Sequence, residues 1–249
     1  MISVNITKFF PTAEGGTFTA LSDVRFSVAQ GEFVTIFGTN GCGKTTLLNI
    51  LAGLDTDFIG SVSVRGKNPK ESTIGFVFQN YNDALFPWRS AIDNVALPLV
   101  VQGIDADTAR AKALKLLKRV GLDHKAKERI YTLSGGQRQL VSICRSFVRD
   151  PDFLILDEPC SALDYQTTKK VELEVQDLWM HSNIPALCVS HDVDEAVFLA
   201  DKVIVLSRSP GRIKAIIDVR LPRPRTLETF TSQEFFEVRN EVLKHFSYE

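Results

Sequence analysis

The stretch Gly38-Thr-Asn-Gly-Cys-Gly43-Lys44-Thr45 decides the fold class of this chain. It fits the pattern G-x-x-x-x-G-K-[ST] and lies between an apolar run at Glu32–Phe37 and a helical pattern at Lys44–Ala52. Glycines let a backbone wrap closely around an anion, and the N–H groups at the start of a helix supply partial positive charge. The sequence therefore predicts a phosphate-binding loop that joins a strand to a helix.

The side chains of this loop have predicted roles toward a nucleoside triphosphate. Lys44 would bring a full positive charge to the β- and γ-phosphates, and the Thr45 hydroxyl would bind Mg²⁺. The predicted nucleotide-binding residues of the loop are Gly38, Thr39, Asn40, Gly41, Cys42, Gly43, Lys44, Thr45 and Thr46. The alternative is a chance match in a glycine-containing turn, and the flanking strand and helix patterns disfavour it.

A second apolar run, Phe153-Leu-Ile-Leu156, ends in the carboxylates Asp157 and Glu158. Such a run is typical of a strand buried on both faces of a parallel sheet, and ligands bind beyond the carboxyl ends of these strands. Asp157 is predicted to support Mg²⁺, and Glu158 to activate the attacking water as general base. The alternative is a surface Asp-Glu pair, which the phosphate loop elsewhere in the chain disfavours.

Apolar periodicity predicts an α/β chain with a parallel-sheet core, an N-terminal β region and an inserted helical segment. Strands are predicted at Ile2–Phe9, Val24–Val28, Glu32–Phe37, Ser61–Arg65, Thr73–Val77, Phe153–Leu156, Ala186–Ser190 and Lys202–Ser207. Helices are predicted at Lys44–Ala52, Ser90–Gln102, Ala106–Val120, Gly136–Val148, Tyr165–Met180, Val193–Leu199 and Ser232–Phe246. The expected divisions are a core at 1–79 and 150–221, a helical subdomain at 80–149 and a helical tail at 222–249.

Composition and charge restrict the class of partner. The net charge is -1 and no basic run stands out, so we expect no nucleic-acid partner. Cys42, Cys144, Cys160 and Cys188 form no CxxC pair and are predicted to be reduced packing residues; a bulky group on Cys42 would block ATP. No stretch approaches the roughly 20 apolar residues that span a bilayer, and no signal peptide is expected. Action at a membrane would therefore require a partner.

Leu133-Ser134-Gly135-Gly136-Gln137 precedes a predicted helix and has the chemistry of a second anion site. Taken alone it also fits a serine helix cap with a flexible lead-in. In this chain it resembles the signature motif of ABC ATPases, at the spacing from Asp157 that the family has. Further family landmarks match in order, namely the adenine-stacking aromatic Phe18, the Q-loop glutamine Gln79, the D-loop Ser161-Ala-Leu-Asp164 and the switch histidine His191.

The resemblance covers nearly the whole chain and implies a single ABC ATPase domain with the P-loop NTPase (RecA-like) fold. It implies ATP and Mg²⁺ as cofactors. The implied catalytic residues are Lys44, Gln79, Glu158 and His191; the implied nucleotide contacts beyond the phosphate loop are Phe18, Ser134, Gly135, Gly136, Gln137 and Asp164; the implied metal contacts are Thr45, Gln79 and Asp157. Two ATPase chains, identical or similar, would pair head to tail, each ATP lying between one phosphate loop and the other signature.

One branch of the family is favoured. Phe86-Pro-Trp-Arg89, Asp93-Asn-Val-Ala-Leu-Pro98, Val189-Ser-His-Asp192 and Ser207-Arg-Ser-Pro-Gly-Arg212 resemble importers for nitrate, sulfonates, taurine and bicarbonate. This implies a peripheral subunit on the cytoplasmic face of the inner membrane. Its partners would be a membrane permease and, indirectly, a periplasmic or lipid-anchored solute-binding protein. Phe86, Pro87 and Trp88 are predicted to dock the permease, unless Trp88 packs inside the helical subdomain.

Two other functions are weighed against the importer. A non-transport ABC ATPase, in DNA repair or translation, usually carries long coiled-coil insertions or two cassettes on one chain, and this chain carries neither. A regulatory nucleotide-binding module without turnover would not need both Lys44 and Glu158. We therefore expect a transport ATPase, with the non-transport ABC ATPase as the alternative.

Overall fold

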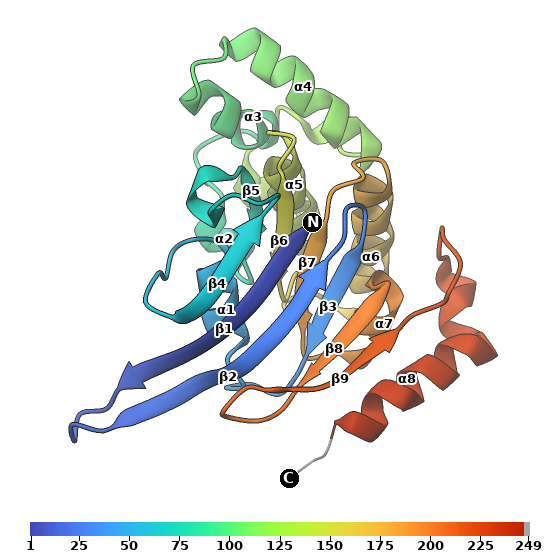
Figure 1. Ribbon diagram of the computed structural model, residues 1–249. Coiled ribbons are helices and arrows are strands. Elements are labelled where there is room, and N and C mark those ends of the chain that lie inside the picture. Colours follow the sequence, from blue (N-terminus) through green and yellow to red (C-terminus); the bar gives the residue numbers. More distant parts are fainter. Residues whose placement is uncertain (247–249) are drawn as a thin grey trace.

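The computed structural model describes residues 1–246, apart from the side chain of Asp83 (Figure 1). The last three positions of the predicted tail at 222–249 therefore lie outside the described residues. Among residues 1–246, no helix combines the length and the apolar character that crossing a bilayer requires.

A six-stranded sheet forms the centre of the molecule, in the order β5-β6-β7-β3-β8-β9. Its strands are β3 (Phe33–Phe37), β5 (Ile74–Val77), β6 (Phe153–Asp157), β7 (Ala186–Ser190), β8 (Lys202–Leu206) and β9 (Ile213–Asp218). The first five pair in parallel, and β9 pairs antiparallel with β8 at the edge. Every residue of β3 and of β7 is buried, as the continuous apolar runs predict.

The two faces of this sheet pack against different layers. Alternate residues of one strand point to opposite faces, so Val34 and Ile36 join α1 (Lys44–Leu51) and the antiparallel sheet in one core. Phe33 and Phe37 point the other way, into a core shared with the helices. The antiparallel sheet contains β1 (Ile2–Pro11), β2 (Thr17–Val28) and β4 (Ile59–Val64), in the order β2-β1-β4. It lies across the front of Figure 1.

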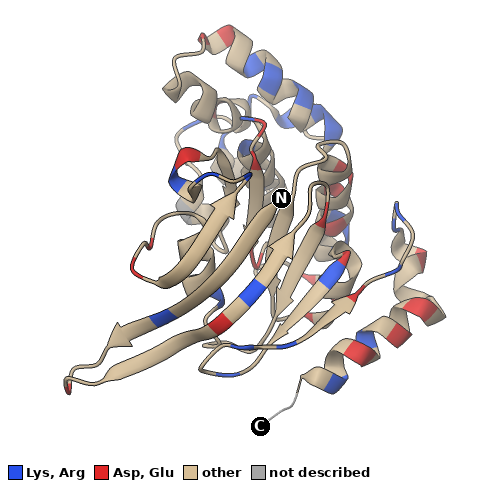
Figure 2. Cartoon of the chain, viewed as in Figure 1, with Lys and Arg blue, Asp and Glu red and all other residues tan. Residues whose placement is uncertain are grey.

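The helical insertion forms the upper part of Figure 1. It contains α2 (Tyr81–Ala84), α3 (Ala91–Val101), α4 (Ala106–Arg119) and α5 (Gly135–Phe147), with 3₁₀ turns at Asp123–Lys125 and Ile130–Thr132. Ser90 caps α3 and Asp105 caps α4, as expected of N-cap residues. Figure 2 shows lysine and arginine positions along α4, whose inward face buries Ala109, Ala113 and Leu117. The boundaries at 80 and 149 stay a prediction.

The remaining helices cover the other end of the sheet. They are α6 (Tyr165–Met180), α7 (Val193–Leu199) and α8 (Gln233–His245), with a 3₁₀ turn at Leu227–Thr231. Another 3₁₀ turn, Pro69–Glu71, follows β4. Arg225 is almost fully buried and donates to the Val197 and Phe198 carbonyls at the end of α7. This arginine attaches the segment that leads into α8 to the core, because a buried guanidinium needs such acceptors.

The structure confirms the predicted fold class and corrects three elements. β2 begins at Thr17, whereas the prediction began at Val24; its first residues are exposed and give no apolar run. β9 was not predicted, because it is a half-exposed edge strand in which the exposed Ile216 interrupts the alternation of apolar and polar residues. The segment after Gln79, for which no helix was predicted, contains the short helix α2, which the Asn80 side chain caps.

Candidate phosphate-binding and catalytic site

The predicted phosphate loop joins β3 to α1, and glycine is required within it. Gly41 and Gly43 have φ of +80° and +98°, in the left-handed region. A Cβ on Gly43 would lie 2.7 Å from Leu21 Cδ2 and 3.1 Å from the Ala20 carbonyl. The loop therefore follows its path only with glycine here, closely packed on β2.

Lys44 lies across the mouth of this loop. Its amine donates to the carbonyls of Gly38 at 2.9 Å and Thr39 at 3.2 Å, and it lies 3.5 Å from Glu158 Oε1. Only 7% of Lys44 is exposed. A buried ammonium needs such partners, and the phosphates of a nucleotide are acceptors of the same kind.

Glu158 is the centre of a network that contains all four predicted catalytic residues. Its Oε2 accepts from Gln79 Nε2 at 3.1 Å and lies 3.0 Å from His191 Nδ1. Its own φ is +45°, and its N–H donates to the Val189 carbonyl at 3.1 Å. Non-glycine residues held in this region are frequent at functional sites, where the surrounding structure fixes them.

Asp157, the last residue of β6, is a partly buried carboxylate beside this network. Burial, and then the charge of Glu158, raises its pKa to about 6, although Lys44 acts in the opposite direction. A divalent cation would stabilise the ionised form. Thr45 lines the same cleft, and one hydroxyl with one carboxylate suits Mg²⁺, which takes its other ligands from phosphates and water. Residues 1–246 contain no cluster of three His, Cys, Asp or Glu side chains that could enclose a metal.

A cleft of about 810 Å³ connects these groups and has the size of a nucleotide site. It is lined by the predicted residues Phe18, Asn40, Gly41, Gly43, Lys44, Thr45, Thr46, Gln79, Asp157, Glu158 and His191. It is also lined by five residues that were not predicted as site residues, Phe10, Ala20, Asn80, Ser161 and Ala162. Of these, Ser161 and Ala162 had a sequence signal, as part of the stretch that ends at Asp164.

Phe10 is the most informative of the missed residues. It lies directly opposite Phe18 in the antiparallel pair β1–β2, so both rings are on one face of the sheet. The Lys8 amine lies 4.7 Å from the centre of the Phe10 ring and also pairs with Asp55 at 2.9 Å. Two aromatic side chains, rather than Phe18 alone, therefore line the cleft on the side of the β1–β2 hairpin.

The signature residues lie outside this cleft. Ser134 caps α5 and forms a capping box with Gln137, with bonds of 3.0 and 3.3 Å. A Cβ on Gly136 would lie 2.3 Å from Thr167 Cγ2, so glycine allows α5 to approach α6. Asp164 caps α6 and accepts from the Thr167 N–H at 3.0 Å. Within one described chain, these predicted nucleotide contacts, Gly135 included, do not line the cleft.

Cys42 contributes backbone to the loop but not its side chain. The side chain is fully buried in the core beneath the loop, as the packing interpretation predicts for all four cysteines. Burial raises the pKa of the Cys42 thiol, although Lys44 lowers it. Gly211 packs against the same segment, where a Cβ would lie 2.3 Å from the Cys42 carbonyl.

The chain matches known proteins over most of its length. The family model described as ABC transporter matches residues 21–161. An aliphatic sulfonates import ATP-binding protein, SsuB of Bacillus licheniformis, is 40% identical over 230 residues, which cover 92% of this chain and 87% of that one. A taurine import ATP-binding protein, TauB of Sinorhizobium fredii, is 43% identical over 206 residues, covering 82% and 76%.

Solved structures agree with the family assignment. A dimeric post-hydrolysis ATP-binding cassette bound to ADP and Pi is 31% identical with a TM-score of 0.75, covering 89% of this chain and all of that one. The predicted family and fold are thus confirmed, and the nucleotide cofactor with them. This chain belongs to the ABC transporter family, as an ATP-binding and ATP-hydrolysing cassette.

Proposed function

We propose that the chain hydrolyses ATP to drive the import of a small anionic solute, of the sulfonate, taurine, nitrate or bicarbonate type. The single observation that carries the ATPase chemistry is the network of Lys44, Gln79 and His191 around Glu158. The solute class is supported by the named relatives, which import sulfonates and taurine. It is also supported by the motif resemblance at Phe86–Arg89.

The residues divide the chemistry between charge and positioning. Lys44 neutralises charge on the β- and γ-phosphates, and Glu158 accepts a proton from the attacking water. Gln79 and His191 each contact Glu158 Oε2 and so fix its orientation. Mg²⁺, when held by Thr45 and Asp157, supplies further charge neutralisation at the phosphates.

A second cassette completes the site in this proposal. Ser134 is exposed at the N-terminus of α5, where backbone N–H groups favour an anion, but it does not line the cleft of its own chain. A head-to-tail pair would bring the partner's signature to each cleft with two-fold symmetry. The dimeric solved cassette supports this arrangement.

The permease is proposed to dock on the face that carries Trp88. Trp88 is 65% exposed, which disfavours the alternative that it packs inside the helical subdomain. Its ring meets that of Phe86 edge-on at 5.3 Å, and Arg145 lies 5.4 Å over Phe86. Arg145 also lines a groove of about 190 Å³ that includes the half-exposed Phe78. Exposed aromatics around a groove are typical of interface anchors.

The proposed docking face around Trp88 also gives the proposed location of the chain in the cell. The chain would lie on the cytoplasmic face of the membrane, held there by the permease, with Pro87 and Trp88 in the interface. A solute-binding protein would contact the permease from the opposite side and never this chain.

The ATPase proposal is tested by comparing wild type, Glu158→Gln and the control Glu237→Gln, on α8. Wild type and the control should hydrolyse ATP, whereas Glu158→Gln should be inactive and elute from gel filtration as an ATP- and Mg²⁺-dependent dimer. Equal hydrolysis by Glu158→Gln would refute the assigned base. If none of the three forms a dimer with ATP, a pair of identical chains is wrong.

The docking proposal is tested by co-purification with the permease. Trp88→Ala should reduce recovery of the complex, while Leu54→Ala, which alters a similarly exposed apolar residue at 71% exposure, should not. Unchanged assembly of the Trp88 variant would remove Trp88 from the interface.

A further inference from the structure

Glu195 is a buried carboxyl beneath the catalytic network that the proposed chemistry does not use. It lies in the first turn of α7, and only 4% of it is exposed. Its Oε2 accepts a short hydrogen bond from the Ser190 hydroxyl, and its carboxyl lies beside the Cys160 thiol. Its second oxygen, Oε1, has no partner among the described residues.

The two partners of Glu195 belong to the two loops that carry the reacting side chains. Ser190 is the last residue of β7 and immediately precedes His191. Cys160 follows Glu158 by two positions, in the turn after β6. Glu195 therefore contacts both the Glu158 loop and the His191 loop from the protein interior. The two loops also contact each other directly, because His191 lies 3.0 Å from Glu158.

Helix capping does not explain the inward position of Glu195. A glutamate at the third position of a helix normally reaches back to the N–H of the capping residue. Here the Asp192 side chain caps α7, accepting from the N–H groups of Asp194 at 2.7 Å and Glu195 at 3.3 Å. The Asp192 N–H itself donates to Ser190 Oγ at 3.0 Å. The Glu195 carboxyl is thus left to accept from Ser190 and to pack beside Cys160.

We propose that Glu195 is a positioning residue, which holds His191 against Glu158 by hydrogen-bonding Ser190 in the His191 loop and packing beside Cys160 in the Glu158 loop. This inference rests on the proposed ATPase function. Glu195 does not contact the substrate. It controls the distance between Glu158 and His191, which do. A leucine of similar size would fill the same volume, so the carboxyl is needed for its hydrogen bonds and not for packing.

The protonation state of Glu195 decides which substitution should preserve the bridge. Burial raises its pKa to about 7, against the lowering effects of Ser190, Cys160 and His191 and with the raising effect of Asp192. Near neutral pH the carboxyl is substantially protonated, so its charge is not the required property. Glutamine, which is neutral and has the same shape, should therefore preserve the role of Glu195.

The experiment compares Glu195→Gln and Glu195→Leu in the full chain. Glu195→Gln should keep kcat within about twofold, whereas Glu195→Leu should lower kcat on the order of tenfold or more with little change in the Kd for ATP, because small displacements of catalytic groups are costly. Glu172→Leu is the matched control: it alters another buried glutamate, on α6, whose partner Lys169 belongs to neither loop. It should lower thermal stability without the loss of kcat.

A double-mutant cycle separates positioning from a purely structural role. In a His191→Ala background, Glu195→Leu should cause almost no further loss, because both changes remove the same function. The proposal would be overturned if Glu195→Leu lowered kcat in the His191→Ala background by the same factor as in the wild type. It would also be overturned by a wild-type kcat in Glu195→Leu, or by an equal loss of kcat in Glu195→Gln.

A measurement without turnover keeps this inference separate from the proposed function. The NMR signals of the His191 ring should move in Glu195→Leu and stay in place in Glu195→Gln and Glu172→Leu. Unmoved His191 signals in the leucine variant would refute the positioning role, even if the wild type proved inactive. Absent ATP hydrolysis in the wild type would instead refute the proposed function.

Discussion

Replacing Phe10 by alanine is expected to weaken the binding of ATP and to leave the binding of inorganic tripolyphosphate unchanged. Phe10 and Phe18 are opposite each other on β1 and β2, and both line the cleft that contains Lys44. The base of a nucleotide whose phosphates reach Lys44 can stack on such side chains. A ligand without a base cannot, so the two ligands separate stacking from phosphate binding.

The exposure of the two rings sets the magnitude. Phe10 is 37% exposed and Phe18 is 47% exposed, so each ring keeps accessible surface that a base can contact. Stacking of a base on an aromatic side chain contributes about 1–3 kcal/mol by alanine substitution. Since two rings share one base, the lower end applies to each, and about 1.4 kcal/mol corresponds to a tenfold increase in Kd.

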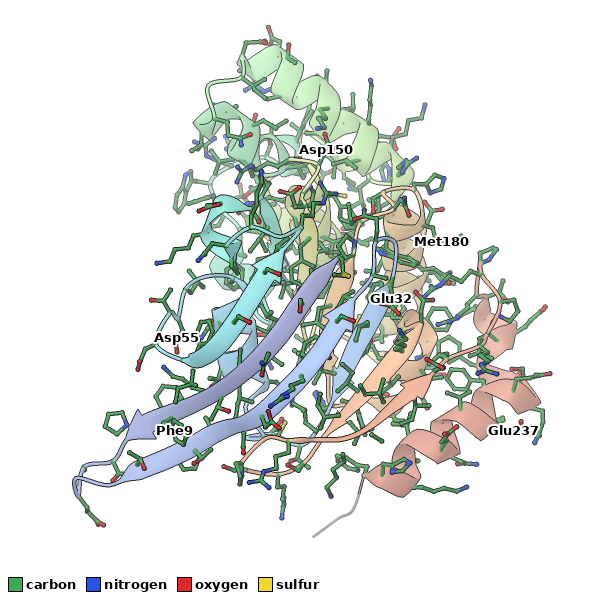
Figure 3. All side chains as sticks on the ribbon, viewed as in Figure 1. Phe9, Glu32, Asp55, Asp150, Met180 and Glu237 are labelled. Atoms are coloured by element: carbon green, nitrogen blue, oxygen red, sulfur yellow. The ribbon has the colours of Figure 1, made fainter. Side chains whose placement is uncertain are left out.

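The assay is equilibrium competition between a fluorescent nucleotide and either ATP or tripolyphosphate. Phe9→Ala is the matched control: Phe9, labelled on β1 in Figure 3, is 39% exposed and pairs with Thr19 on the opposite face. Phe10→Ala and Phe18→Ala should each raise the Kd for ATP about tenfold, and Phe9→Ala should leave it unchanged. Equal losses for ATP and tripolyphosphate, or an equal effect of Phe9→Ala, would refute the stacking role.

Three further outcomes follow from burial and close contact. The native protein should resist a bulky thiol reagent at Cys42, since the side chain is buried and burial raises its pKa; rapid labelling seen by mass spectrometry would contradict this. Burial raises the pKa of Glu172 from 4.5 to about 8, so between these pH values the folded state binds a proton that the unfolded state has lost. The free energy of unfolding should therefore fall as pH rises from 4.5 to about 8. In Glu172→Gln the thermal midpoint should fall less over the same pH range. Gly136→Ala should abolish ATP-dependent dimerisation in gel filtration, because its Cβ would lie 2.3 Å from Thr167 Cγ2, and Thr167→Ser should restore it by removing that methyl.

Local sequence signals predicted the side chains that follow buried strands. Asp157 ends β6, Glu158 follows it, and His191 directly follows β7. A short apolar run was enough to locate the two carboxylates, and the family resemblance identified His191. Lys44 follows from glycine spacing alone. These predictions depend on a few neighbouring residues, which is why they needed no knowledge of the tertiary arrangement.

The aromatic end of the cleft depends on pairing that the sequence does not display. The register of β1 against β2 shifts between Ile6 and Lys8 and again between Lys8 and Phe9. Each irregularity changes which residues of a strand share a face, so simple alternation cannot tell which residue faces Phe18. Phe10 was missed for this reason, and the predicted strand ended one residue before it.

Strand order explains how residues so distant in sequence form one network. Gln79, Glu158, His191 and Lys44 follow β5, β6, β7 and β3, which are neighbours in that order in the sheet. Parallel neighbours lie about 4.8 Å apart, so side chains at successive strand ends can reach one another, and they do so here at 3.0 to 3.5 Å. An order that separated β6 from β5 or from β7 would move Gln79 or His191 away from Glu158. Because β6 and β7 lie between β5 and β3, Glu158 is the contact that Gln79, His191 and Lys44 share. The proposed catalysis therefore depends on the distance between the two loops that follow β6 and β7.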